Sequence, residues 1–147
     1  MRTDFTNSPT PPHPAPDGAP GTDSPRILIA EDNAINQKVV MLILRRAGFN
    51  IDVVSDGNEA VEAHRQRPYD LILMDCQMPS MDGFEASRHI RKLNTPQPVI
   101  IAVTANALVG ERERCLDAGM DDYLSKPFQA EQLVSIVKKW AAVRRKS

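Results

Sequence analysis

The chain has 147 residues, which suits one domain large enough to bury a hydrophobic core. Its 18 basic and 19 acidic side chains are mixed along the sequence and give a formal net charge of −1, which does not indicate a nucleic-acid or membrane surface. No apolar stretch approaches the roughly 20 residues of a membrane span, and the 2 cysteines form no disulfide framework, so we expect a reduced, cytoplasmic setting.

The first 25 residues differ in composition from the rest of the chain. Seven of the 12 prolines lie there, among Gly, Ser, Thr and Asp. Such a segment buries too little apolar surface to offset the entropy that it loses on ordering, so we predict a disordered tail or linker over residues 1–25. The folded domain is then expected over residues 26–143, and a short basic tail over residues 144–147.

From Arg26 onward, short apolar segments alternate with segments that have helical periodicity. The expected strands are 26–30, 51–54, 71–74, 99–103 and 122–125. The expected helices are 34–47, 58–66, 84–93, 108–118 and a last one after Pro127. Near-continuous apolar strands are typical of a parallel sheet that is covered by helices on both faces. We therefore predict an α/β, doubly wound (βα)5 fold with five parallel strands in the order 2-1-3-4-5.

Four of the expected strands end on chemically active side chains. Glu31 and Asp32 follow the first strand, Asp75 the third, Thr104 the fourth and Lys126 the fifth. Ligands of such sheets bind in the crevice beyond the carboxyl ends of the strands, so these side chains should converge there. Clustered carboxylates raise one another's pKa unless a cation is present. The sequence therefore predicts an acidic pocket that suits a divalent cation and a phosphoryl group.

At these positions the sequence resembles the receiver domain of two-component response regulators. The resemblance rests on Glu31-Asp32, Asp75, Met78-Pro79, Met81-Asp82-Gly83, Thr104-Ala105 and Lys126-Pro127, in this order. It covers residues 26 to about 143 and implies a flavodoxin-like fold. The amino-acid sequences around Asn33 and Cys76 are most similar to those of receivers that are attached to hybrid histidine kinases.

The resemblance implies a role for each residue of the pocket. Asp75 would be the phosphoacceptor, whose carboxylate attacks a phosphoryl group and becomes an acyl phosphate. Lys126 would pair with a phosphoryl oxygen. The hydroxyl of Thr104 and the backbone N–H of Ala105 would donate hydrogen bonds to the other oxygens.

A Mg²⁺ site is also implied. Asp32 and Asp75 would bind the ion directly, the backbone carbonyl of Gln77 would supply a further oxygen, and Glu31 would act through water. Mn²⁺ could substitute at the same site. The alternative is a carboxylate cluster that is paired only with Lys126.

The family's switch would use Thr104 and Tyr123. Thr104 would move toward the phosphoryl group, and the ring of Tyr123 would enter the space that it leaves; the alternative for Tyr123 is an exposed aromatic residue at the sheet edge. The responding face would comprise the fourth helix, the fifth strand and the fifth helix, and would contact a protein target. Receivers typically have a cis peptide bond at the position of Lys126–Pro127, and we expect one here.

The implied function is that of a phosphoacceptor in a two-component phosphorelay. The phosphoryl donor would be a histidine kinase or a histidine phosphotransfer protein. The chain would catalyse its own phosphorylation and dephosphorylation but would not be a kinase, because the sequence has no ATP-binding segment or histidine box. The alternative is a pseudo-receiver, a docking module that works without phosphorylation. A haloacid-dehalogenase-type phosphatase would need a second acid two residues after the nucleophile. Gln77 stands at that position, which argues against this class of enzyme.

Overall fold

The computed structural model describes residues 25–105 and 109–146, without the side chains of residues 109 and 144–146. The tail expected over residues 1–25 therefore lies outside the described residues, apart from Pro25. No helix in the described part of the chain is long and apolar enough to cross a membrane.

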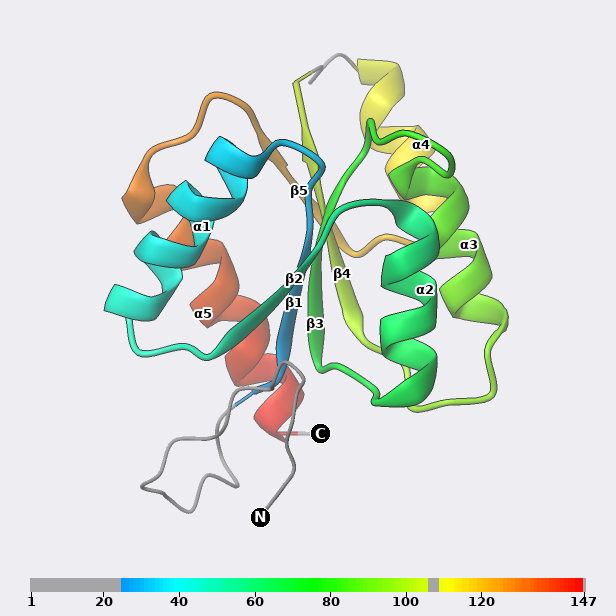
Figure 1. Cartoon of the computed structure of the whole chain (residues 1–147), viewed down its shortest axis with the longest axis horizontal. Coiled ribbons are helices and arrows are strands. Elements are labelled where there is room, and N and C mark those ends of the chain that lie inside the picture. Colours follow the sequence, from blue (N-terminus) through cyan, green and yellow to red (C-terminus); the bar gives the residue numbers. More distant parts are fainter. Residues whose placement is uncertain (1–24, 106–108, 147) are drawn as a thin grey trace.

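Strands and helices alternate along the chain (Figure 1). The strands are β1 (Ile27–Ala30), β2 (Ile51–Val54), β3 (Leu71–Asp75), β4 (Val99–Thr104) and β5 (Asp122–Ser125). The helices are α1 (Ala34–Arg46), α2 (Gly57–Gln66), α3 (Gly83–Lys92), α4 (Val109–Asp117) and α5 (Ala130–Lys146). All paired strands are parallel and their order is β2-β1-β3-β4-β5, which confirms the predicted fold.

The boundaries of the elements lie close to the predicted ones. Helix α2 begins at Gly57 and α3 at Gly83, one residue earlier than expected in each case. The start expected for the fourth helix, residue 108, lies outside the described residues. Helix α5 continues to Lys146, so three residues of the stretch that we had separated as a basic tail belong to this helix.

Helices cover both faces of the sheet, α1 and α5 on one side and α2, α3 and α4 on the other (Figure 1). Successive strand residues point to opposite faces, so each strand contributes to both cores. In β3, Leu71 and Leu73 pack with the residues of the α1–α5 side, whereas Ile72 and Met74 pack on the other side. This burial on both faces explains why the strands read as continuous apolar runs.

Polar capping side chains start the helices that follow β1 and β3 at the carboxyl edge of the sheet. The side chain of Asn33 accepts hydrogen bonds at the start of α1, and the side chain of Asp82 does so at the start of α3. Gly83 follows Asp82 and lies against the end of β3, where a Cβ would be only 2.2 Å from the carbonyl oxygen of Asp75. The β3–α3 loop therefore wraps closely around Asp75, and only glycine fits at position 83.

Candidate functional site

Three carboxylates meet at the carboxyl edge of the sheet, as the sequence predicted. Glu31 and Asp32 follow β1, and Asp75 ends β3, its direct neighbour in the sheet. One oxygen of each carboxylate lies within 4.8 Å of the other two. Asp32 is exposed, whereas Glu31 is 5% and Asp75 is 6% exposed. The cluster therefore has two buried members and one that faces solvent.

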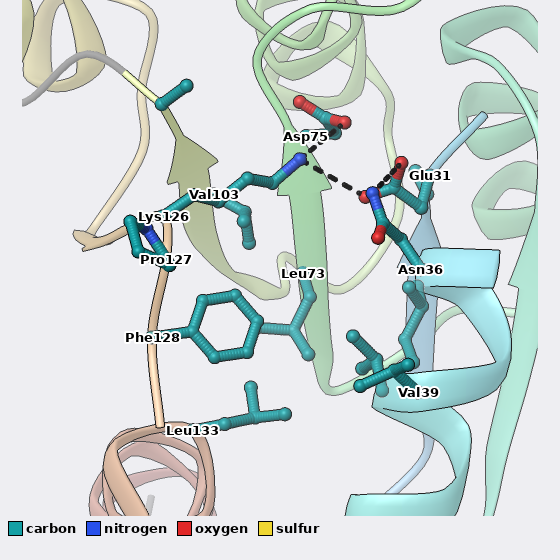
Figure 2. Close-up of a pocket in the computed structure, with 14 residues that line it drawn as sticks. Glu31, Asn36, Val39, Leu73, Asp75, Val103, Lys126, Pro127, Phe128 and Leu133 are labelled. Atoms are coloured by element: carbon teal, nitrogen blue, oxygen red, sulfur yellow. Dashed lines mark hydrogen bonds and ion pairs between the residues drawn. The ribbon is translucent and has the colours of Figure 1, made fainter. Parts of the chain in front are cut away.

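Lys126 reaches this cluster from the end of β5 (Figure 2). Its Nζ lies 3.3 Å from Oδ2 of Asp75 and 3.4 Å from Oε1 of Glu31. Burial lowers the pKa of the Lys126 ammonium, but the charges of Asp75 and Glu31 outweigh this effect and hold the pKa above its usual value. Lys126 is thus charged and bridges the two buried carboxylates. The Lys126–Pro127 peptide bond is cis, as predicted.

The pKa of Glu31 is raised, because the opposing contacts do not fully offset its burial and the charge of Asp75. Burial raises the pKa of Glu31, and the neighbouring charge of Asp75 raises it further. The backbone N–H of Asn33, at 3.1 Å, and the ammonium of Lys126 oppose this shift. The amide of Asn36 also lies 3.5 Å from Oε2 of Glu31, a contact that the sequence analysis did not predict. The ammonium of Lys126 contacts two of the three clustered carboxylates, so the site can accommodate a further cation.

Hydrogen bonding fixes the orientation of the Asp75 carboxylate. The backbone N–H of Gln77 donates to Oδ1 at 3.0 Å, while Oδ2 faces Lys126. The tight β3–α3 loop brings this N–H into place. The role expected for the Gln77 carbonyl stays a prediction. A carboxylate held in this way, beside an ammonium and at the end of a buried strand, is suited to nucleophilic attack.

The hydroxyl of Thr104 is directed toward α4. Thr104 is buried at the end of β4, and its Oγ1 donates to Oε2 of Glu111 in the first turn of α4 at 3.2 Å. Glu111 was not among the predicted site residues, and we find no signal in the sequence that would have singled it out. Ala105 follows Thr104 and is exposed, and its expected role as a backbone donor stays a prediction.

Tyr123 lies on the same face of the sheet as Thr104. In the parallel register Tyr123 pairs with Ala102, two residues before Thr104, and residues at a spacing of two share a face. The ring is half-buried and packs against the core on the α2–α3–α4 side. Tyr123 is therefore not a fully exposed edge residue, and it lies next to the strand that carries Thr104.

Two cavities flank the carboxylate cluster. One, of about 480 Å³, lies between α1 and the start of α5 and has an apolar lining that includes Leu73 and Phe128 (Figure 2). The other, of about 540 Å³, is lined by Asp32, Gln77 and Glu111, among others. The lining of the first cavity also includes Glu31, Asp75 and Lys126, so this cavity opens onto the buried side of the cluster. The second cavity gives a small polar ligand space beside Asp32.

The donor set of the cluster fits a hard divalent cation. Carboxylate and carbonyl oxygens are the ligands that Mg²⁺ prefers, and Mg²⁺ usually keeps several of its waters. The exposure of Asp32 leaves room for such waters, while the buried Glu31 and Asp75 supply the charge. The residues present therefore suit Mg²⁺ better than a softer metal, because the cluster contains no histidine or cysteine ligand.

Comparison with known proteins found a matching family model and related sequences. The family model of the response regulator receiver domain matches residues 27–138. A hybrid signal transduction histidine kinase B from Dictyostelium discoideum is 42% identical over 127 residues; the match covers 78% of this chain but only 6% of that protein. This chain thus spans a small part of the length of such relatives.

Solved structures with the same fold include several receiver domains. The receiver domain of the sensor histidine kinase PA1611 from Pseudomonas aeruginosa, described with a magnesium ion in its active-site cleft, is 46% identical. Its TM-score is 0.75, and the match covers 81% of this chain and 98% of that one. The receiver domain of Ssk1 from Saccharomyces cerevisiae, crystallised with the histidine phosphotransfer protein Ypd1, is 28% identical with a TM-score of 0.77, and the match covers 83% of this chain and 92% of that one.

Proposed function

This chain belongs to the response regulator receiver domains of two-component systems, and from that premise we propose that it accepts a phosphoryl group on Asp75 and signals by a change of conformation. The observation that carries the proposal is the position of Asp75. Its carboxylate ends the central strand, is oriented by a backbone N–H and faces the ammonium of Lys126 at 3.3 Å.

The proposed reaction is a phosphoryl transfer from a phosphohistidine. An oxygen of Asp75 attacks phosphorus, a new P–O bond forms, and the P–N bond breaks so that its electron pair returns to the leaving imidazole. The product is an acyl phosphate on Asp75. Lys126 offsets the charge that collects on the phosphoryl oxygens, and the hydroxyl of Thr104 and the N–H of Ala105 donate to them. Such a site works by positioning and charge neutralisation. Hydrolysis of the acyl phosphate by water would reset the protein.

We propose that Glu31, Asp32 and Asp75, together with the backbone carbonyl of Gln77, hold Mg²⁺. When bound, the ion would neutralise the carboxylates and the incoming phosphoryl group. Support comes from the carboxylate oxygens that lie within 4.8 Å of one another, and from the magnesium described for the PA1611 receiver. Mn²⁺ prefers similar oxygen ligands and would be expected to fit.

The proposed phosphoryl donor is a histidine kinase or a histidine phosphotransfer protein, as in the complex of Ypd1 with the Ssk1 receiver. A donor must approach the edge of the sheet next to Asp75, where α1 begins. Helix α1 exposes Ile35, Val39 and Leu42, at 72%, 47% and 54%, and their spacing places them along one side of the helix. Apolar side chains on an exposed helix face suit a protein partner. We therefore propose that this face of α1 binds the donor. We also propose that the transfer takes place in the cytoplasm.

The signal would leave through the face formed by α4, β5 and α5. Thr104 and Tyr123 share a sheet face beside α4, so a shift of Thr104 toward the phosphoryl group would change the packing that Tyr123 meets. The alternative, a docking module without phosphorylation, would not need the charge arrangement around Asp75.

Phosphorylation by acetyl phosphate tests the proposal. With Mg²⁺, the wild-type chain should gain the mass of one phosphoryl group, and the product should be labile to hydroxylamine. Asp75→Asn should abolish the gain and keep the fold, because the two side chains are nearly isosteric. Asp56→Asn is the matched control, since Asp56 only caps α2 and Asn caps equally well. A wild type that gains no phosphoryl group, or an Asp75→Asn variant that gains it, would overturn the proposal.

A further inference from the structure

Glu111 connects the end of β4 to two helices. Its carboxylate accepts the hydrogen bond of Thr104 at 3.2 Å and lies 3.7 Å from the guanidinium of Arg114, one turn further along α4. Its side chain is only 11% exposed. The guanidinium of Arg114 in turn lies 4.1 Å from the centre of the Phe84 ring at the start of α3. A displacement of Glu111 would therefore change contacts of both α4 and α3.

The hydroxyl of Thr104 has a single hydrogen to donate. A threonine hydroxyl is one donor and cannot serve two acceptors at once. In the structure this hydrogen goes to Glu111. In the proposed function, the same hydrogen goes to an oxygen of the phosphoryl group on Asp75. Glu111 and the phosphoryl group thus compete for Thr104.

We propose that Glu111 is a positioning residue that holds Thr104, and with it the first turn of α4, in the unphosphorylated arrangement. Phosphorylation of Asp75 then withdraws Thr104 from Glu111, and the loss of this hydrogen bond transmits the change to α4. The assignment of the phosphoryl group to Asp75 rests on the proposed function. The hydrogen bond between Thr104 and Glu111 does not depend on it.

Electrostatic repulsion favours breaking the hydrogen bond between Thr104 and Glu111 once Asp75 carries a phosphoryl group. It lines the same cavity of about 540 Å³ as Asp32 and Gln77, so the negative charge of a phosphoryl group would repel it. Arg114 lies on the same helix and can stay paired with Glu111 when Thr104 leaves. The carboxylate is then not left without a counter-charge, which gives it a second stable arrangement. Two arrangements of comparable free energy are what a switch requires.

The first test follows the unphosphorylated protein by hydrogen exchange. Glu111→Ala should speed the exchange of the α4 amides that donate to the carbonyls of the first turn by about tenfold, which corresponds to one hydrogen bond of about 1.4 kcal/mol. Thr104→Val should have a similar effect, and the double variant should add nothing further. Glu111→Gln keeps an acceptor oxygen and should stay closer to wild type. Glu113→Ala is the control, because Glu113 is an exposed carboxylate of the same helix.

The second test measures the rate of phosphorylation by acetyl phosphate with Mg²⁺. Glu111→Ala should react about tenfold faster than wild type, because Thr104 is no longer held away from the phosphoryl group, and Glu113→Ala should react at the wild-type rate. In a Thr104→Val background, Glu111→Ala should change nothing. A Glu111→Ala variant with wild-type exchange and rate, or an equal effect in both backgrounds, would overturn the inference. A wild type that takes up no phosphoryl group would instead overturn the proposed function, while the exchange test would still decide whether Glu111 holds α4.

Discussion

Replacing Lys126 by methionine tests the charge balance of the site. Methionine is similar in length but has no charge, so Lys126→Met leaves Glu31 and Asp75 without the ammonium that lies 3.4 and 3.3 Å from them. Both carboxylates are buried and their charges repel each other. We therefore expect the variant to be less stable than wild type when divalent cations are removed with EDTA.

The size of this loss follows from the burial of the partners. Removing one partner of a buried ion pair destabilises a protein by about 3–5 kcal/mol. The side chain of Lys126 is 27% exposed, so solvent screens part of the loss. We expect the free energy of unfolding to fall by about 2 kcal/mol at neutral pH, which corresponds to a fall of about 8 °C in the melting temperature. Urea unfolding followed by circular dichroism would measure it.

Mg²⁺ should reverse most of the loss, because a cation bound to the carboxylates replaces the missing ammonium. The native state then gains the free energy of binding, and the variant should bind Mg²⁺ more tightly than wild type since one repelling charge is gone. Lys139→Met is the matched control: Lys139 pairs with Asp122 at 3.6 Å but is 63% exposed, so its loss should be small with or without Mg²⁺. An equal loss for Lys126→Met in EDTA and in Mg²⁺, or no loss in EDTA, would refute the reasoning.

Two further predictions concern the scaffold of the site. Burial lowers the pKa of His64, whose Nδ1 accepts a backbone N–H at 3.0 Å, so the folded protein binds fewer protons here than the unfolded chain. The free energy of unfolding should therefore fall as the pH drops below about 6.5, toward the lower pKa of the folded state. His64→Gln should flatten this dependence in urea titrations between about pH 5 and about pH 7, and an unchanged slope would contradict it. Gly83→Ala should destabilise by about 1–3 kcal/mol or more, because the new methyl would meet the carbonyl of Asp75. Gly110→Ala, with nothing within 4 Å of its new methyl, should instead stabilise by about 0.5–1 kcal/mol, and equal effects of the two alanines in thermal unfolding would contradict the packing argument.

The sequence by itself determined the fold and the meeting of the acidic residues. Apolar runs of four or five residues, each followed by a helical pattern, predicted parallel strands, and the structure confirms their order. Once the strands are parallel, their carboxyl ends share an edge, so the convergence of Glu31, Asp32 and Asp75 follows from chain direction alone. Capping residues such as Asn33 also lie in the local sequence, because a cap bonds to the next turn of its own helix.

Only the tertiary structure decided which partners these side chains have. That Thr104 donates to Glu111, and that Lys126 bridges Glu31 and Asp75 rather than pairing with one of them, depends on how α4 and the β5–α5 turn pack against the sheet. Periodicity reports which face of an element is buried, but it carries no information about distances between elements that are far apart in the chain. Hydrogen bonds and ion pairs are decided by differences of an ångström or less, and only the packed core fixes separations that finely.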